Sequence, residues 1–297
     1  MREVGLSVAT VMGGLRAIVH YPGAGRPLPG IVLVDGAGDS AADGWGEQPA
    51  TFGGCGAVLL THDKPGCGGS PGDWHEQTLA DRARDSLAAL EVLRSQPGVD
   101  PGRVGFLGIS QGGWVSFLAA SQAPQAVRQV VTISGPGVSV AEQERYRIAC
   151  AVDGDEEALA WVDDRARQLL AGEDPASVAA RQRAYADRPW YDLACGHYTP
   201  GMLAFFARIA GFDPAAVLPG VRCPVFAVFG GADTSVPVRR SVAVLSELLP
   251  SDPRHAIAVF PDADHGLMPI PSDETTPYAA RLPPGFLAML TQWLASK

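Results

Sequence analysis

Residues 103–123 read RVGFLGISQGGWVSFLAASQA, and this stretch decides the fold. Its first seven residues form a largely apolar run that predicts a buried strand, and residues 111–123 predict a helix that ends at Pro124. At the junction, Gly108-Ile109-Ser110-Gln111-Gly112 matches G-x-S-x-G in the strand–turn–helix context that this motif requires. A side chain at position 108 or 112 would collide with the neighbouring strand or helix. Ser110 is therefore the predicted nucleophile; the alternative is a glycine-rich turn that carries a serine by chance.

Further apolar runs on both sides of this stretch predict the other strands of a sheet. They cover residues 4–9, 15–21, 30–35, 57–61, 127–134, 225–229 and 256–260. Continuous runs rich in β-branched residues suit strands that helices cover on both faces, as in a parallel sheet. A capping pattern at Thr78 and Asp81 opens one helix, and others are expected over about residues 238–249 and 284–296. We therefore predict an α/β fold with a mostly parallel central sheet flanked by helices.

The segment between Pro136 and Pro224 contains no convincing strand. Connections between a helix and a strand in α/β folds are usually about 2–6 residues long, so this segment is read as an insertion. Several stretches in it look helical, at roughly residues 140–152, 156–171, 175–186 and 201–209. We predict a core formed by residues 1–137 and 223–297, with residues 138–222 as an inserted helical cap.

A serine hydroxyl is a weak nucleophile at neutral pH and needs an adjacent base. In folds with this serine motif the chain order is Ser, then Asp or Glu, then His, which leaves three of the six histidines as candidates: His197, His255 and His265. His265 directly follows a predicted strand, at the edge of the sheet where the sites of open α/β sheets gather. It is the predicted general base, and its alternative role is a loop histidine near the final helix.

The acid that orients the histidine is expected after the preceding strand. Asp233 follows Phe229-Gly230-Gly231-Ala232 there and could accept a hydrogen bond from one imidazole nitrogen. Its alternative role is an N-cap for the next helix, as is common for aspartate at helix starts. Asp262 and Asp264 are rivals, although a residue next to the histidine seldom reaches its far nitrogen.

Acyl transfer also needs hydrogen-bond donors for the tetrahedral oxyanion. The backbone N–H groups of Gln111 and of Ala37, in the loop of residues 35–38, are the predicted donors. The same loop fits a dinucleotide fingerprint, Gly36-x-Gly38-x-x-Ala41 after a strand. Gly44, Gly46 and Pro49 interrupt the helix that such a site needs, so nucleotide binding is the weaker interpretation.

The composition favours a folded, soluble, cytoplasmic protein. Hydrophobic residues make up 46% of the 297 residues, and a net charge of −9 disfavours a nucleic-acid partner. The five cysteines are odd in number and form no CxxC pair, which favours free thiols over disulfides or a zinc site. The start of the chain lacks a signal pattern, and no apolar run approaches the roughly 18–20 residues of a membrane span. We expect a small-molecule substrate, no membrane partner, no metal and no cofactor; the sequence specifies no oligomeric state.

With these residues in place, the chain resembles the α/β-hydrolase superfamily over nearly its whole length. Residues 63–74 (DKPGCGGSPGDW) resemble the DKRG-x-G-x-S-x-G loop of esterase-like members, and residues 109–114 (ISQGGW) and 133–136 (ISGP) continue the match. These members are similar to the dienelactone-hydrolase, prolyl-oligopeptidase and bile-acid acyltransferase/thioesterase groups. The resemblance implies hydrolysis of an ester, thioester or amide by a serine, without metal or cofactor.

Two positions depart from that pattern. Asp35 stands where many relatives carry a histidine that supports the oxyanion loop, and Pro65 stands where arginine is common. An aspartate there adds negative charge, which would reshape the hole or bind a cationic group of the substrate.

Aromatic residues in the insertion and near the elbow predict a substrate with a small apolar or aromatic group. The expected pocket walls are Trp74, His75, Trp114, Tyr146, Trp190, Tyr191, His197, Tyr198 and Met268, and core packing is the alternative for each. The function predicted is a serine hydrolase that cleaves a carboxylic ester or thioester through an acyl-enzyme on Ser110. The alternatives are a triad-dependent acyltransferase, cyclase or amide hydrolase in secondary metabolism, or a ligand-binding module without catalysis.

Overall fold

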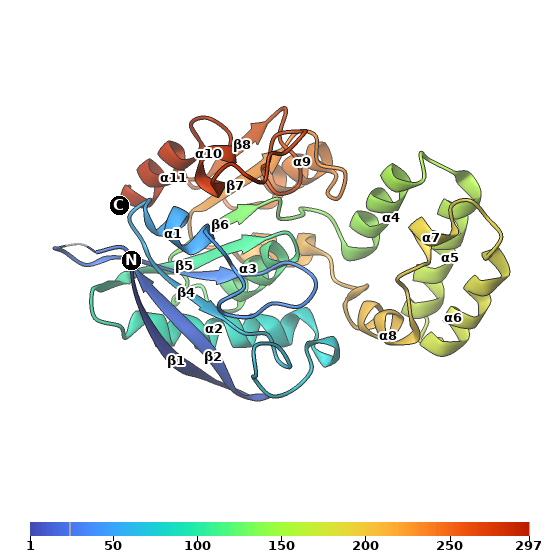
Figure 1. The fold of residues 1–297 in the computed structure, drawn as a ribbon, viewed down its shortest axis with the longest axis horizontal. Coiled ribbons are helices and arrows are strands. Elements are labelled where there is room, and N and C mark those ends of the chain that lie inside the picture. The colour runs from blue at the N-terminus through green and yellow to red at the C-terminus, as the bar shows by residue number, and fades with distance from the viewer. Residues whose placement is uncertain (24, 297) are drawn as a thin grey trace.

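A computed structural model describes residues 1–23 and 25–296 of the chain. It contains an eight-stranded sheet in the order β1-β2-β4-β3-β5-β6-β7-β8 (Figure 1). β1 pairs antiparallel with β2 and β2 with β4, whereas all other neighbours are parallel. The strands are β1 (Arg2–Thr10), β2 (Gly13–Tyr21), β3 (Leu28–Val34), β4 (Val58–His62), β5 (Val99–Ile109), β6 (Gln129–Ile133), β7 (Val225–Gly230) and β8 (Ala256–Phe260). The predicted α/β fold and each predicted strand are confirmed.

Helices cover both faces of the middle of this sheet, which explains why β3, β6 and β7 are continuously buried and largely apolar. Along β3, Val32 and Val34 belong to one buried cluster, while Ile31 and Leu33 belong to another on the opposite face. The first cluster includes side chains of α2 (Leu79–Arg94), α3 (Gln111–Gln122) and α9 (Val238–Leu248). The second includes side chains of α1 (Gln48–Gly53) and α11 (Phe286–Ala295), and α10 (Tyr278–Arg281) packs beside it. The capping box predicted at Thr78 forms at the start of α2.

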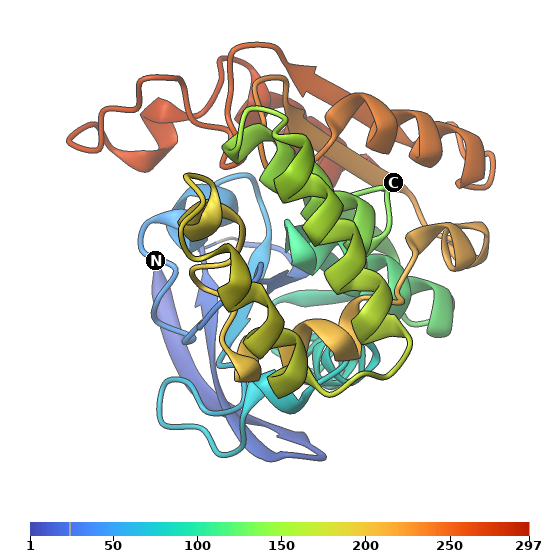
Figure 2. The same ribbon diagram turned by 90° about the vertical axis from the view of Figure 1, so that its right-hand side faces the viewer.

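The segment after β6 forms a separate group of helices. It comprises α4 (Val140–Ala151), α5 (Glu156–Leu170), α6 (Pro175–Gln182), α7 (Tyr191–Ala194) and α8 (Pro200–Ile209). Four of these helices begin where a side chain accepts an N–H of the first turn, at Ser139, Asp155, Asp174 and Thr199. This group lies beyond the ends of β5 and β6 in Figure 1 and in front of the sheet in Figure 2. The division of the chain at residues 138 and 222 remains a prediction.

Short 3-10 turns complete the fold, at Trp74–Glu76, Arg183–Tyr185, Pro214–Ala216 and Leu218–Gly220. Within residues 1–23 and 25–296, no helix combines the length and the apolar character needed to cross a membrane. All five cysteines are free thiols, as their number and spacing predicted.

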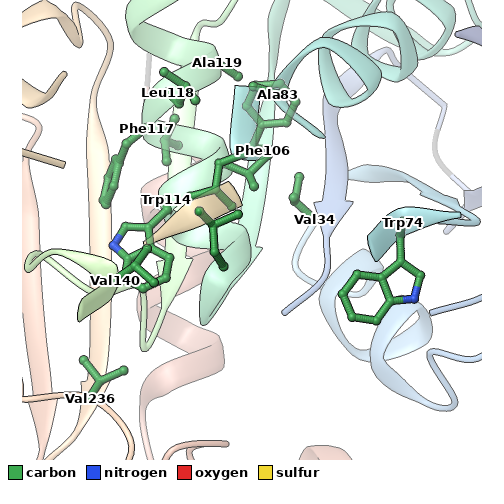
Figure 3. Packing of buried hydrophobic residues seen from close by; sticks show 14 of the residues in the cluster. Val34, Trp74, Ala83, Phe106, Trp114, Phe117, Leu118, Ala119, Val140 and Val236 are labelled. Carbon is green, nitrogen blue, oxygen red and sulfur yellow. The ribbon is translucent and has the colours of Figure 1, made fainter. Parts of the chain in front are cut away.

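Trp114 joins the helical insertion to the sheet. Figure 3 shows its ring on α3 beside Val140, the first residue of α4. Its indole N–H donates a hydrogen bond to the Val138 carbonyl over 3.0 Å, and its ring packs edge-on against Phe212. The side chain is buried, so the elbow helix and the start of the insertion share one packed contact.

The backbone of β6 occupies the space that a side chain on Gly105 of β5 would need, so this position should be intolerant of a side chain. A Cβ on Gly105 would lie 1.9 Å from the carbonyl oxygen of Gln129. Gly105→Ala should therefore lower the free energy of unfolding by at least about 2 kcal/mol, measured by urea denaturation. The matched control is Gly102→Ala in the same strand, where the nearest atom lies 3.4 Å away. Equal stability of the two variants would contradict this account of the strand contact.

Candidate active site

Ser110 lies at the turn between β5 and α3 in a strained conformation. Its φ is +53°, which is rare for a residue other than glycine and is typical of functional positions. A Cβ on Gly108 would lie 2.3 Å from the carbonyl oxygen of Gly112, and one on Gly112 would lie 2.1 Å from that of Val34. The collisions predicted for these two positions are thus confirmed, and together they allow the chain to turn within one residue.

His265 follows β8 directly and is hydrogen bonded to Asp233. Its Nδ1 lies 2.8 Å from Oδ2 of Asp233, whose side chain is fully buried. The other carboxylate oxygen, Oδ1, accepts the N–H groups of Ser235 and Val236. Asp233 therefore orders the turn before α9 and contacts the histidine at the same time. Pro237 occupies the N-cap position of α9, so the alternative role of Asp233 as an N-cap does not occur.

The rival Asp264 does not contact the imidazole in this way. Its Oδ1 accepts the backbone N–H groups of Gly266 and Met268, which shapes the loop that carries His265. Asp233, which comes from a different loop of the sheet edge, is the carboxylate that reaches Nδ1.

Ser110 and His265 line one cavity of about 300 Å³. Gln111 and Ala37 line it too, so the predicted nucleophile, base and oxyanion donors meet in one place. The serine and the histidine face the same space without a hydrogen bond between them. Such bonds are often absent before a substrate is bound.

The insertion supplies most of the remaining cavity wall. Val140, Gln143, Glu144 and Arg147 share one face of α4, and α8 contributes an apolar face whose members recur at helical spacing: Met202, Phe205, Phe206 and Ile209. Neither face was predicted from the sequence, although the spacing of the apolar residues on α8 was a usable signal. Of the predicted wall residues, Trp114, His197 and Tyr198 do line the cavity.

Trp74 and His75 do not line the cavity, contrary to the prediction. Trp74 is buried behind α8, where its ring packs edge-on against Phe205 at 4.9 Å between centroids and its N–H donates to Asp39. His75 stacks on Trp74. Both rings therefore pack against α8 and do not line the cavity. Such packing is typical of aromatic rings, which bury a large apolar area.

Tyr146, Trp190, Tyr191 and Met268 also lie outside the cavity wall. Tyr146 donates its hydroxyl hydrogen bond to the backbone oxygen of Asp233. Trp190 is buried against Tyr185, and Tyr191 packs against the same hydrophobic cluster. Met268 packs against the cluster on the α11 side of the sheet. The prediction was wrong for these four residues because an aromatic composition does not show which face of a helix a ring occupies.

The loop of residues 35–38 lies against the elbow and is held by two buried cations. A Cβ on Gly36 would come within 3.4 Å of the Ser110 Cβ. The ammonium group of Lys64 lies 3.0 Å from Oδ2 of Asp35 and donates to the carbonyl oxygens of Gly36 and Gly38. The side chain of Lys64 thus holds three groups of this loop.

Arg82, on α2, is the second cation. Its Nη2 donates to both the carboxylate and the carbonyl oxygen of Asp35, and its Nη1 donates to the side chain of Gln111. Asp35 therefore pairs with Lys64 and Arg82 and does not line the cavity, which contradicts the expectation that it would bind a cationic group of the substrate.

Residues 25–269 match the Hydrolase_4 family, described as serine aminopeptidase, S33. This chain belongs to that family of α/β hydrolases. Uncharacterized protein Rv2307c of Mycobacterium tuberculosis (strain ATCC 25618 / H37Rv) is 36% identical over 115 residues. The matched stretch spans 38% of this chain and 38% of that relative.

Solved structures support the same fold. The structure of DcsB in complex with its substrate analogue superposes with a TM-score of 0.63 at 19% identity, over 99% of the hydrolase and 98% of that chain. Est1E from Butyrivibrio proteoclasticus, bound to ferulic acid, gives a TM-score of 0.58 at 16% identity, over 97% and 96% of the two chains. The 2,6-dihydroxy-pseudo-oxynicotine hydrolase gives 0.60 at 17% identity, over 99% and 68%.

Two further groups bear on the chemistry available to the hydrolase. In the described part of the chain, no group of three or more His, Cys, Asp or Glu side chains is arranged to hold a metal ion. Cys67 lies half-buried in the loop after β4, and burial raises the pKa of its thiol. Cys67 therefore lacks the lowered pKa that marks a reactive thiolate.

The buried charged side chains beside the loop of residues 35–38 shift one another's pKa values. Burial alone would raise the pKa of Asp35, but Arg82 and Lys64 outweigh it and lower that pKa. Burial and the neighbouring Arg82 lower the pKa of Lys64 to about 8, from 10.5. Below that pH the protonated lysine can donate to Asp35 and to both loop carbonyls.

The lowered pKa of Lys64 predicts a specific dependence of stability on pH. Between pH 8 and pH 10.5 the unfolded chain holds a proton that the folded hydrolase has released. The free energy of unfolding of the wild type should therefore rise with pH relative to Lys64→Met, by up to about 1.4 kcal/mol per pH unit. The contribution is lost as the pH falls through 8. Urea denaturation at several pH values measures it, and a constant difference between the two proteins would refute the shift.

Proposed function

We propose that this hydrolase cleaves a carboxylic ester or thioester of a small apolar or aromatic substrate through an acyl-enzyme on Ser110. The observation that carries the proposal is the 2.8 Å hydrogen bond between Asp233 and His265, in a cavity that both His265 and Ser110 line. A buried carboxylate, an imidazole and a strained serine at the carboxyl edge of one sheet form the arrangement that activates a serine hydroxyl.

The reaction follows from which imidazole nitrogen is free. Because Nδ1–H donates to Asp233, Nε2 of the neutral ring can accept the hydroxyl proton of Ser110 as the oxygen attacks the carbonyl carbon. The imidazolium then gives this proton to the leaving alcohol or thiol, and the acyl group stays on Ser110. A water molecule repeats the sequence, with His265 first as base and then as acid, and releases the carboxylic acid. Asp233 stabilises the imidazolium in both halves.

The negative oxygen of each tetrahedral intermediate needs fixed donors. We assign this role to the backbone N–H groups of Ala37 and Gln111, which flank Ser110 in the cavity wall. Lys64 and Arg82 hold the carbonyl and carboxylate groups of the same loop, so its N–H groups are fixed before the substrate binds. The first turn of α3 adds its helix dipole at the same point.

The apolar face of α8 indicates where the substrate body binds. Its side chains, with Trp114, would contact an aliphatic or aromatic group, and the insertion would act as a cap that excludes water. Est1E, a structural neighbour, binds ferulic acid, which supports an aromatic acyl group as one possibility to test. The family description, serine aminopeptidase, supports an amide bond as the alternative target. Free cysteines throughout the chain support a cytoplasmic location.

Ser110→Ala should remove both covalent labelling and turnover. A fluorophosphonate probe should label the wild type at Ser110, and hydrolysis of p-nitrophenyl esters should peak at one acyl length that fits the cavity. The substitution should lower kcat on the order of 10⁵–10⁶-fold and leave the denaturation curve unchanged. Labelling without hydrolysis would favour acyl transfer, cyclisation or amide cleavage. A folded wild type that takes up no probe would overturn the mechanism in favour of a ligand-binding module.

Asp233 and its rival Asp264 can be separated by matched substitutions. Asp233→Asn keeps an oxygen for Ser235 and Val236 but presents an NH₂ group to Nδ1, which forces the wrong tautomer. It should lower kcat on the order of 10³–10⁴-fold. In Asp264→Asn the amide oxygen can still accept its two backbone N–H groups, so kcat should change less than about threefold. A larger loss in Asp264→Asn than in Asp233→Asn would reverse the assignment of the acid.

A further inference from the structure

The cavity wall formed by α4 contains the guanidinium group of Arg147, which shares the carboxylate of Glu144 with the buried Arg165 of α5 outside the cavity lining. Arg147 makes two hydrogen bonds of 3.1 Å to Glu144, from Nε and from Nη2. Arg165, whose side chain is 1% exposed, lies 3.3 Å from the same carboxylate. Two positive charges therefore contact one negative charge, and a net charge of +1 remains in the group of three side chains, of which Arg147 and Glu144 line the cavity.

Neighbouring acids do not balance this charge. Asp163 pairs with Arg145 on the outer side of α4, and Glu142 pairs with Arg240. Asp233 is occupied by His265. Among the described residues, the charge of Arg147 and Arg165 is thus matched only by Glu144.

Besides Glu144, a histidine and a tyrosine contact Arg147. His197 contacts its Nη2, and burial and the positive charge of Arg147 lower the pKa of this histidine. The hydroxyl of Tyr198 accepts a hydrogen bond from the same nitrogen over 3.2 Å. Nε of the buried Arg165 has no hydrogen-bond partner among the described residues. These contacts hold the guanidinium of Arg147 in place, while the local positive charge stays unmatched.

Arg147, Ser110 and His265 line the same cavity. Arg147 is the arginine that a substrate can reach, because its side chain is 30% exposed whereas that of Arg165 is 1% exposed. A positive charge held beside apolar groups is stabilised when an anion pairs with it. A guanidinium suits a carboxylate in particular, because its planar donors match two oxygens.

We infer that the substrate carries an ionised carboxylate away from the bond that is cleaved, and that Arg147 binds it. This inference rests on the proposed function and narrows it to half-esters and related monoanionic esters. The carboxylate of the substrate would neutralise the net positive charge of Arg147, Arg165 and Glu144. The apolar face of α8 would contact the part of the substrate between its carboxylate and its ester group. Arg147 would then determine specificity without taking part in the chemical steps.

Paired substrates test this directly in the wild type. One series places the carboxylate on the acyl side: p-nitrophenyl monoesters of succinic, glutaric and adipic acid, each beside a neutral partner with an isopropyl group in place of the carboxylate. A second series places it on the leaving group: 4-acetoxybenzoate beside 4-isopropylphenyl acetate. The ratio of kcat/KM for the anionic ester over the neutral one should exceed 1 in at least one pair. A ratio at or below 1 in every pair would overturn the inference. Hydrolysis of the neutral esters in the same assay would still support the proposed function.

Arg147→Met should lower that ratio by at least roughly 10-fold, mainly through KM of the anionic ester. Arg147→Lys should retain part of the preference. The matched control is Arg145→Met on the same helix, where the arginine pairs with Asp163 and does not line the cavity. An equal ratio in Arg147→Met and Arg145→Met would overturn the role of Arg147.

A binding measurement separates the subsite from the chemistry. Monomethyl glutarate should bind Ser110→Ala, measured by calorimetry, at least roughly 10-fold more tightly than it binds the double variant Ser110→Ala/Arg147→Met. This difference can be measured even if no ester is turned over, so the subsite and the proposed function can fail separately. Equal binding by the two proteins contradicts the subsite.

Discussion

The close approach of α3 to β3 at Gly112 is the constraint on which the active site depends. The carbonyl oxygen of Val34 occupies the space that a Cβ would need, so the helix can start only because this position has no side chain. The chain must then reverse at Ser110, which accounts for its positive φ. The same contact brings the loop after β3 against the serine. One steric condition thus places the nucleophile and the loop of Ala37 together.

Charged side chains stabilise the loop of residues 35–38 against the elbow, once the steric contact has brought the two together. Asp35, Lys64 and Arg82 form a buried group beneath the loop, and Arg82 also reaches the side chain of Gln111 at the elbow. The loop and the elbow are therefore connected through one guanidinium. A second group of net positive charge, Arg147, Glu144 and Arg165, lies on α4 and α5. Both groups occur in a chain whose net charge is −9, so their local charge is opposite in sign to that of the whole chain.

The strands and the residues at their ends could be predicted from the sequence because both depend on local order. Helices on both faces make the central strands largely apolar, and Asp233 and His265 follow two neighbouring parallel strands. The start of β5 was predicted four residues late: Val99 pairs with Leu28 before the ladder shifts, and no apolar pattern marks that pairing.

The cavity walls could not be predicted in the same way. They depend on which face each helix of the insertion presents, and the buried rings of Trp74 and Trp190 show that composition alone does not decide this. The group around Asp35 joins three segments that only tertiary packing brings together. The proposed catalytic roles rest on positions that both the chain order and the geometry select.

The hydrogen bond from the hydroxyl of Tyr146 to the backbone oxygen of Asp233 links α4 of the insertion to the loop that carries the acid. Gln143 adds a second link from α4 to the same loop, through the carbonyl oxygen of Ser235. A rigid swing of α4 away from the sheet would pull on the main chain that positions the carboxylate. Rearrangements that spare α4, such as side-chain rotations along α8, would leave both of these hydrogen bonds intact. Sequence changes at the root of α4 should accordingly affect the alignment of the acid as well as the opening of the cavity.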